Sequence, residues 1–456
     1  MKSLWTEQAL LSDGWTDSVR VGISDTGLIA SVEAGVPPAP TDRRLGALLP
    51  APVNLHSHAF QRAMAGMTER RGPAARDTFW TWRHLMFRFL EALTPEDVEA
   101  IAAFVQMEML ESGYASVAEF HYVHHQPDGT PYADIGELSG RIAAAAQATG
   151  IGLTLLPVLY QYAGCNRAPL ARGQVRFGNT PERFAKLHER AGTIMSALPS
   201  DASLGVAPHS LRAVGPEGLD ATIAMAAGRP HHMHLAEQVG EVDEVRAVYG
   251  RRPVEWLLDN HGVDESWCLI HCTQMTQDET LRLAQTGAVA GLCPITESSL
   301  GDGIFNGTDY LGAGGRFGVG SDSNIRIALS EELRTLEYSQ RLRDGLRAVL
   351  ATERESTGRV LFAGTVRGGA QAVQRQSGAI ASGNWADLLA LDTTATDLAN
   401  HRGDALLDSF VFAGDDRMVA DVWSAGRHLV HKGHHIDRDR IVGRYRKTMS
   451  SLKDRL

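Results

Sequence analysis

The feature that most constrains the fold is an alternation of short apolar runs with longer segments of helical periodicity. From about residue 150 onward these segments recur in the order expected for parallel βαβ units. Together with two earlier runs they predict eight strands, at residues 46–55, 114–122, 152–160, 204–210, 231–237, 267–273, 288–294 and 316–322. We therefore expect an α/β protein built on a (β/α)₈ TIM barrel, in which catalytic residues lie at the C-terminal ends of the strands.

The two ends of the chain have a different pattern. Residues 1–47 and 378–440 contain short alternating runs separated by turn residues, and we expect them to pair into one small β-sandwich domain. Residues 48–377 would form the barrel, and residues 441–456 a C-terminal tail. A chain of 456 residues has room for both units, because single cores rarely exceed about 300 residues.

Composition argues against several classes of function. The formal net charge is −10 and no basic tract is present, which argues against a nucleic-acid or an anionic membrane partner. No apolar run reaches the roughly 18 residues of a membrane-spanning helix, and the N-terminus lacks the apolar region of an export signal. The four cysteines indicate no disulfide framework, so we expect a cytoplasmic protein.

His56 and His58 follow the first predicted strand as a His-x-His pair. Side chains on an extended chain alternate with period two, so both imidazoles can approach one ion from the same side. On its own, such a pair is more often two solvated histidines at the end of a strand.

Later strand ends carry further residues of the kinds that bind metals. His234 and Glu237 end the fifth predicted strand, His271 ends the sixth and Asp322 ends the eighth. Imidazole nitrogen and carboxylate oxygen together favour zinc, or iron, in a site with an open position for water. We therefore predict a metal site at this end of the barrel. The alternative is a set of polar core residues that only resemble one.

Glu237 lies three residues after His234, where its carboxylate could reach a metal-bound water. In that position it could take a proton from the water and pass it to a leaving nitrogen. The alternative is an acidic residue that stabilises a helix N-terminus.

Other histidines are expected to be structural. His232 faces the same way as His234 but lies about 6.6 Å deeper in the barrel, so we expect a core residue. His124 and His125, in a cluster with His121 after the second predicted strand, are expected in a polar loop.

These motifs resemble the amidohydrolase superfamily of metal-dependent hydrolases, over about residues 46–330. The resemblance implies the barrel, and the flanking segments are similar to the small sandwich domain of many members. Many members with two metals use a modified lysine from the fourth strand, but "LGVAPHSLR" contains none, so we expect one divalent metal per subunit, zinc or iron. By the same resemblance the metal ligands are His56, His58, His234 and Asp322, and the catalytic residues are Glu237 as proton shuttle, His271 on the bound water, and Asp322.

Longer stretches are similar to the N-formimino-L-glutamate deiminases of histidine degradation, a family within this superfamily. They are "HSHAFQRAMAG", "FWTWRHLMFRF", "APHSLRAV" and "CPITESSLGDGIFNG". The resemblance implies attack by metal-bound hydroxide on the formimino carbon, which releases ammonia and leaves N-formyl-L-glutamate.

A glutamyl substrate brings two carboxylates, which arginine binds well because its planar fork makes paired hydrogen bonds. Arg212, two residues beyond the fourth predicted strand, is suitably placed, and His209 lies nearby. The resemblance adds Gln61 and Tyr122 as substrate contacts, and Arg83 is a further candidate. The alternatives are a surface cation for Arg83, a helix residue for Gln61 and a wall residue for Tyr122.

Two other functions stay open on the sequence alone. A related hydrolase could act on guanine or another nucleobase, which would require stacking aromatic side chains rather than paired cations. A non-catalytic scaffold of the same fold would usually lack part of the metal set. The segment 68–83, "TERRGPAARDTFWTWR", could cover the site or contact a second subunit, and we expect a homodimer.

Overall fold

The predicted barrel strands form a parallel ring. The computed structural model describes residues 2–69 and 79–456. Strands β5 to β8 form one parallel sheet, with β9 paired to β7, and β10 to β13 form a second. Parallel bridges from Val206 to His231 and from Ser57 to Asp322 join the two sheets at both edges and close the ring. The ring contains β5 (Val53–Ser57), β6 (Ser116–His121), β7 (Gly152–Leu159), β8 (Ser203–Leu204), β9 (Ala207–Pro208), β10 (His231–Leu235), β11 (Trp267–His271), β12 (Val289–Leu292) and β13 (Arg316–Val319).

The predicted bounds of the first strand are wrong, because residues 46–55 belong to two different sheets. Their first half lies in β4 (Arg43–Pro50), which joins the sheet formed by the chain ends and extends beyond residue 47. Pro50 and Pro52 flank the point where the chain leaves that sheet, and proline cannot donate to a ladder. The fourth predicted strand is likewise divided, into β8 and β9.

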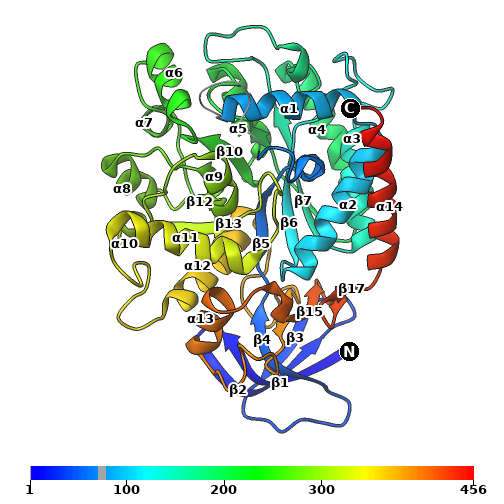
Figure 1. Ribbon diagram of the computed structural model, residues 1–456, viewed down its shortest axis with the longest axis vertical. Helices are drawn as coiled ribbons and strands as arrows, with labels where there is room; N and C mark the ends of the chain where they lie inside the picture. Colours follow the sequence, from blue (N-terminus) through cyan, green and yellow to red (C-terminus); the bar gives the residue numbers. More distant parts are fainter. Residues whose placement is uncertain (1, 70–78) are drawn as a thin grey trace.

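Helices follow the barrel strands and surround the ring (Figure 1). Helix α2 begins as its sequence predicts: the Thr94 hydroxyl accepts from the Asp97 amide, and the Asp97 carboxylate accepts from the Thr94 amide. None of the described helices combines the length and apolarity needed to cross a bilayer. The helices of this part are α1 (Phe79–Ala92), α2 (Pro95–Glu111), α3 (Glu137–Thr149), α4 (Pro181–Met195), α5 (Pro216–Ala226), α6 (Val239–Tyr249), α7 (Pro253–Asn260), α8 (Gln277–Gln285), α9 (Pro294–Leu300), α10 (Gly307–Gly312), α11 (Leu329–Asp344), α12 (Thr357–Ala372) and the short 3₁₀ turns η1 (Ala59–Met64) and η2 (Arg172–Gln174).

Strands from both ends of the chain pair in a separate sheet below the barrel (Figure 1), which confirms the predicted pairing of the two ends; they form one eight-stranded sheet where a sandwich was expected. Its order is β17-β16-β15-β14-β4-β1-β2-β3, so β4 near the N-terminus pairs with β14 near the C-terminus. A bridge between Leu28 and Trp385 folds the β3 edge back toward β14, around a hydrophobic core of its own. The remaining elements here are β1 (Lys2–Leu11), β2 (Gly14–Ile23), β3 (Ile29–Glu33), β14 (Leu388–Leu391), α13 (Asp404–Phe412), η3 (Asp416–Met418), β15 (Val419–Ser424), β16 (Arg427–His431) and β17 (His434–His435).

Two arginines anchor this sheet to the barrel. Arg375 pairs with Asp201 at 3.0 Å and with Asp387 at 2.6 Å, and these three side chains are at most 4% exposed. Arg427 of β16 binds the same Asp201 carboxylate at 2.6 Å. Breaking such a buried network would leave an unpaired charge, so it holds the two parts in a defined contact.

Helix α14 (Arg438–Lys453) contains most of the predicted C-terminal tail and packs along α2 (Figure 1). The rings of Phe104 and Tyr445 stack with centroids 3.9 Å apart. Arg444 pairs with Glu99 at 2.6 Å. The end of the chain is therefore an ordered part of the barrel's outer layer.

Candidate metal centre and active site

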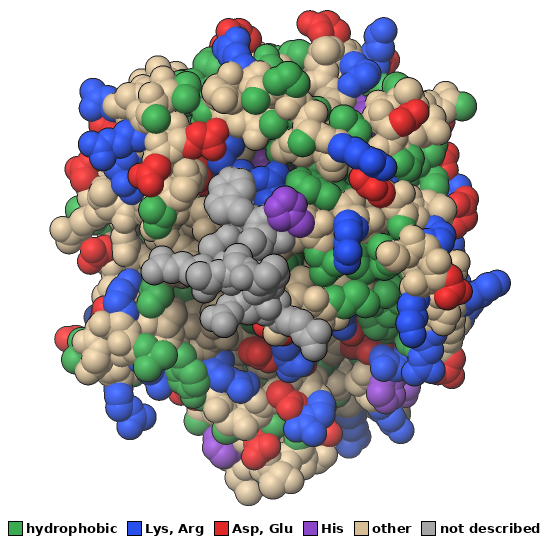
Figure 2. Space-filling model, turned by 45° about the horizontal axis from the view of Figure 1, so that its top comes forward, with side chains coloured by type: hydrophobic (Ala, Val, Ile, Leu, Met, Phe, Trp, Pro, Cys, Tyr) green, Lys and Arg blue, Asp and Glu red, His purple; other side chains and the backbone are tan. Residues whose placement is uncertain are grey.

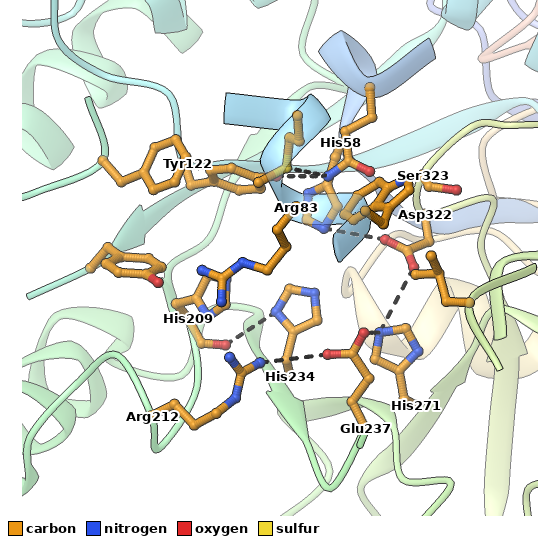
Figure 3. A pocket seen from close by; sticks show the side chains of 16 residues that line it. His58, Arg83, Tyr122, His209, Arg212, His234, Glu237, His271, Asp322 and Ser323 are labelled. Atoms are coloured by element: carbon orange, nitrogen blue, oxygen red, sulfur yellow. Dashed lines mark hydrogen bonds and ion pairs between the residues drawn. The ribbon is translucent and has the colours of Figure 1, made fainter. Parts of the chain in front are cut away.

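Three histidines and one aspartate converge at the C-terminal ends of the barrel strands (Figure 3). His56 Nε2 lies 3.0 Å from His234 Nε2 and 3.5 Å from Asp322 Oδ1. His58 Nε2 lies 3.2 Å from the same carboxylate oxygen. One ligand atom from each residue lies within 4.8 Å of the others, and all four side chains are buried. The structure thus brings together the four residues that the sequence predicted as ligands.

Two of these histidines direct lone pairs into the cluster. His58 Nδ1 lies 3.0 Å from the Phe120 carbonyl, and His234 Nδ1 lies 3.1 Å from the His209 carbonyl. A carbonyl oxygen can only accept, so each Nδ1 carries the proton and each Nε2 of a neutral ring is unprotonated. The lone pair of His58 Nε2 therefore faces Asp322 Oδ1 at 3.2 Å and that of His234 Nε2 faces His56 Nε2 at 3.0 Å, an arrangement that a divalent cation stabilises.

Burial keeps the three histidines neutral. It lowers the pKa of His56 to about 3, and it lowers the pKa values of His58 and His234 as well. Burial alone would raise the pKa of Asp322, but the hydrogen bond from His56 and the positive charge of His271 hold it below its usual value. Neutral imidazoles and an ionised carboxylate are the protonation states that bind a metal.

A glycine permits the close approach of β5 and β13 that assembles the cluster. The Asp322 amide donates to the His56 carbonyl, and the His58 amide donates to the Asp322 carbonyl, both at 2.9 Å. A Cβ atom at Gly320 would lie only 2.6 Å from the His56 nitrogen. Glycine therefore lets the two segments that carry His56, His58 and Asp322 meet.

Glu237 and His271 lie beside the four ligands (Figure 3). His271 Nε2 is 3.8 Å from Glu237 Oε1 and 3.8 Å from Asp322 Oδ2. Burial raises the pKa of Glu237, against the opposing charges of His271 and Arg212. Burial also disfavours the charged form of His271, but the surrounding carboxylates raise its pKa to about 10. A carboxyl group with a raised pKa next to a protonated imidazole is suited to proton transfer.

Glu297 supports the far side of the His271 ring, and no sequence motif singles it out. Its Oε1 atom lies 3.2 Å from His271 Nδ1 and accepts from the Cys293 amide at 2.8 Å. Glu297 lies in the first turn of α9 and is buried. An acidic residue at a helix start is ordinarily a cap, so the sequence does not distinguish this one.

The five predicted substrate contacts line one cavity together with the ligand cluster (Figure 3). Gln61 Nε2 donates to the Tyr122 hydroxyl at 2.7 Å. Arg212 Nη2 lies 3.6 Å from Glu237 Oε2. The predicted contacts are Gln61, Arg83, Tyr122, His209 and Arg212, and the lining residues that were not predicted include Trp82, Met86, Tyr160, Phe177, Leu300 and Ser323.

Helix α1 lies across the C-terminal ends of the strands and forms one wall of this cavity (Figure 1). Trp82, Arg83 and Met86 face the cavity from it. The buried Arg176 donates to the Leu90 carbonyl and, at 3.1 Å, to the Leu93 carbonyl, which secures the end of this helix. Figure 2 shows Lys or Arg and His side chains beside a hollow on this face. Residues 70–78 of the predicted cover or subunit contact lie outside the described residues.

Non-glycine residues with a left-handed backbone surround the site, which the sequence did not reveal. Such a conformation costs roughly 1 to 3 kcal/mol per residue and clusters at functional sites. Strands β10, β11 and β13 end earlier than predicted, at or shortly before these residues, of which His271 and Asp322 line the cavity. The residues are Ala236 (φ 52°), His271 (φ 73°), Cys272 (φ 51°), Asp322 (φ 46°) and Asn324 (φ 54°).

The other histidines singled out in the sequence lie outside this cluster. His232 is buried and its Nε2 contacts the Ala372 carbonyl at 2.7 Å, in agreement with the predicted core position. The prediction of a polar loop for His124 and His125 is wrong, because both are at most 1% exposed. Their Nε2 atoms contact the carbonyls of Val158 and Gly178 at 2.9 and 3.0 Å, whereas their buried Nδ1 atoms have no hydrogen-bond partner among the described residues.

Known proteins resemble this chain in both sequence and fold. Residues 47–429 match the amidohydrolase family, and residues 1–46 match the N-terminal domain of formimidoylglutamate deiminase HutF. The chain is 48% identical to formimidoylglutamate deiminase from Pseudomonas aeruginosa, over 100% of both chains. The crystal structure of an amidohydrolase from Brucella melitensis has a TM-score of 0.95 and 47% identity, covering 99% of this chain and 100% of that one.

A more distant structure extends the likeness of the fold. Atrazine chlorohydrolase TrzN from Arthrobacter aurescens TC1, complexed with zinc, is 20% identical, with a TM-score of 0.83 over 98% of this chain and 100% of that one. The ring of parallel strands and the sheet from both chain ends are thus shared well beyond close relatives. The chain belongs to the amidohydrolase family, and its N-terminal segment is the domain found in that family's formimidoylglutamate deiminases.

Proposed function

We propose that this protein hydrolyses N-formimino-L-glutamate to N-formyl-L-glutamate and ammonia in histidine degradation. The observation that carries the proposal is that a metal-ligand cluster, a Glu–His pair and two arginines share one cavity. The formimino carbon needs an activated water, the leaving nitrogen needs a proton, and the glutamyl group brings two carboxylates. The identity of 48% to the Pseudomonas aeruginosa deiminase over both complete chains supports the same substrate.

One divalent metal, most simply zinc, would be held by His56, His58, His234 and Asp322. Three imidazole nitrogens and one carboxylate oxygen suit zinc, with iron as the alternative. When bound, the metal would lower the pKa of a water molecule and polarise the carbon that the water attacks. The neutral rings and the ionised Asp322 described above fit this group.

Glu237 takes one proton from the attacking water and delivers it to the terminal nitrogen, and it then carries the remaining hydroxyl proton of the adduct to the same nitrogen, which leaves as ammonia while the oxygen becomes the formyl carbonyl. The water oxygen adds to the formimino carbon, and the bond from that carbon to the terminal nitrogen then breaks. The raised pKa of Glu237 lets the same group accept and return the proton. His271 directs its Nε2 proton toward the oxygen of the attacking water, where negative charge develops, and Asp322 Oδ2, 3.8 Å away, orients the ring.

Arg212 and Arg83 bind the two carboxylates of the glutamyl group, because a guanidinium group can donate two parallel hydrogen bonds to one carboxylate. His209 lies between the arginines and the ligand cluster and contacts the substrate through its ring (Figure 3). Gln61 and Tyr122, joined by their 2.7 Å hydrogen bond, contact the substrate from the β5 and β6 side.

The experiment is an ammonia-release assay of the metal-loaded protein on a formimino, a guanidino and a nucleobase substrate. Turnover of N-formimino-L-glutamate at least about 100-fold above guanine in kcat/KM supports the proposal, since paired cations discriminate in favour of the dicarboxylate. Turnover of guanine in its place rejects it. Glu237→Gln should retain the metal and abolish turnover, which also rejects a non-catalytic scaffold.

The homodimer and the cytoplasmic location expected from the sequence are further parts of this proposal. Leu342 and Leu346, near the end of α11, are 85% and 64% exposed, and a second copy could cover this apolar surface. Light scattering on the eluting protein measures the mass directly. A particle with the mass of one chain rejects the homodimer.

A further inference from the structure

We infer that Glu241 is a positioning residue that holds Glu237 in the geometry needed for proton transfer. Glu241 lies in the first turn of α6, does not line the cavity and has no part in the proposed chemistry. The inference rests on the proposed role of Glu237, and it adds a residue that acts on the reaction only through another.

The Glu241 carboxylate binds the backbone of the turn that carries Glu237. Its Oε2 atom accepts from the Glu237 amide at 2.9 Å, and its Oε1 atom accepts from the Ala236 amide at 3.1 Å. The side chain is 0% exposed. Charge-assisted hydrogen bonds in such a buried place are stronger than those between neutral groups, so both oxygens hold this turn firmly.

The same turn is held from its opposite side by the loop after β11. The Thr273 hydroxyl donates to the Glu237 carbonyl at 2.7 Å. The Gln274 amide donates to the Ala236 carbonyl at 2.9 Å. Both N–H groups and both carbonyls of residues 236 and 237 therefore have partners, although Ala236 has the strained φ of 52°.

Glu241 also lies next to Arg212, the arginine proposed to bind a substrate carboxylate. Its Oε2 atom is 3.9 Å from Arg212 Nε, and Glu237 Oε2 is 3.6 Å from Arg212 Nη2. One guanidinium group thus lies between the two carboxylates. Since the contacts of Glu241 to the turn are about 1 Å shorter than its contact to Arg212, its loss should affect Glu237 first.

An ordinary cap would have a different pattern of contacts. A glutamate at the third position of a helix usually accepts from the amide of its N-cap residue. The N-cap of α6 is Gln238, yet Glu241 reaches past it to the amides of residues 236 and 237. The contacts therefore serve the catalytic turn rather than the helix end.

The test is the Glu241→Gln variant, whose amide group replaces one acceptor by a donor that faces a backbone N–H. We expect kcat to fall about 10- to 100-fold, with KM changed less than about threefold and with the metal retained. An unchanged kcat, or a loss confined to KM, overturns the inference.

Glu279→Gln is the matched control. Glu279 is also the third residue of its helix, is 3% exposed, accepts from the Thr276 amide at 2.8 Å and pairs with Arg252 at 2.9 Å. It should reproduce any loss of unfolding temperature but keep the wild-type kcat. A comparable fall of kcat in this control would assign the effect to lost stability and overturn the inference.

A double-mutant cycle separates positioning from general damage. In the Glu237→Asp background, whose shorter side chain already displaces the carboxylate but leaves residual turnover, Glu241→Gln should lower kcat less than about threefold, because the group it positions is already out of place. Equal losses in both backgrounds overturn the inference. If Glu241→Gln does not fold, Thr273→Val removes the hydrogen bond on the other side of the turn and should lower kcat in the same selective way; an unchanged kcat there overturns the inference.

A negative result for Glu241 can be told apart from failure of the proposed function. The substrate panel on the wild type decides which compound is hydrolysed. The ratio of variant to wild-type kcat is then measured on that compound, whichever it is, so Glu241 is tested even where the named substrate fails.

Discussion

The Nδ1 atom of His271 lies 3.2 Å from the Glu297 carboxylate, so the opposite nitrogen of the ring faces Glu237. Because both ring nitrogens have carboxylate neighbours, the ring is fixed in orientation as well as in charge. Helix α9, which supplies Glu297, follows β12, one strand further around the barrel from His271.

Glu297→Gln should therefore lower kcat about 10- to 100-fold without loss of the metal, because the amide leaves His271 less firmly oriented and less readily protonated. Steady-state kinetics with metal analysis of the same sample measures both quantities. Glu279→Gln again serves as the control for a buried glutamate outside the cavity. A kcat equal to that of the wild type would contradict the role of the His271–Glu297 pair.

Arg212→Lys should lower kcat/KM for N-formimino-L-glutamate at least about tenfold, because an ammonium group cannot make the paired hydrogen bonds of a guanidinium group. A formimino compound without carboxylates should be affected less, which the same ammonia assay shows directly. Arg183→Lys is a suitable control, since Arg183 donates to Asn179 at 2.8 Å and does not line the cavity. Equal losses on both substrates would count against a carboxylate contact.

Removal of the metal with a chelator should abolish turnover and lower the unfolding temperature, and one equivalent of zinc per chain should restore both. A ligand at 1,000 times its dissociation constant stabilises the native state by about 4 kcal/mol. His58→Ala should lose this response. His428→Ala should keep it, because His428 belongs to a partly exposed cluster with Asp421 in which Arg43 lies 2.7 Å from the carboxylate.

The free energy of unfolding should fall as the pH rises, because the buried carboxyl group of Glu119 loses its proton. Burial raises its pKa to about 7 from an ordinary value of 4.5, against the hydrogen bonds from Ala59 and Ser57. The folded protein therefore binds this proton more tightly than the unfolded chain, so the contribution is complete below pH 4.5 and is lost as the pH approaches 7. The size of the effect is up to about 3 kcal/mol.

Glu119→Gln removes this titration and keeps an oxygen for the Ala59 amide, which donates to Glu119 at 2.7 Å. Urea unfolding of the metal-free wild type and variant at pH 4.5 and pH 8 gives the comparison. The variant should lose less stability over this range than the wild type. Parallel curves for the two proteins would show that Glu119 titrates normally.

The convergence of metal-binding residue types at one end of the barrel could be predicted from local rules, whereas the choice of the four ligands among them came from the family resemblance. The alternation of His56 and His58, and the position of His234 and Asp322 after apolar runs, require only that parallel strands end at the same side of a barrel. The structure adds the proton positions of His58 and His234, which depend on carbonyls of Phe120 and His209 in other segments.

The supporting carboxylates could not be predicted in the same way. Glu241 and Glu297 are acidic residues in first helical turns, where the local pattern predicts a cap. Their partners come from the ends of β10 and β11, through left-handed turns at Ala236 and His271 that are unusual for these residue types. The burial of His124 and His125 was missed for a related reason, because the carbonyls that their Nε2 atoms contact lie in β7 and in the segment around Gly178.

The pairing of β4 with β14 sets an order of events during synthesis. Strand β4 leads into the barrel after Pro50, but the strand that covers its open edge ends only at Leu391. At roughly 5 to 20 residues per second, a ribosome needs on the order of 20 to 70 s to make the intervening chain. During that time the unpaired backbone of β4 can be captured by another nascent chain, so the arrival of β14, rather than formation of the barrel, closes the period in which this edge is open to aggregation.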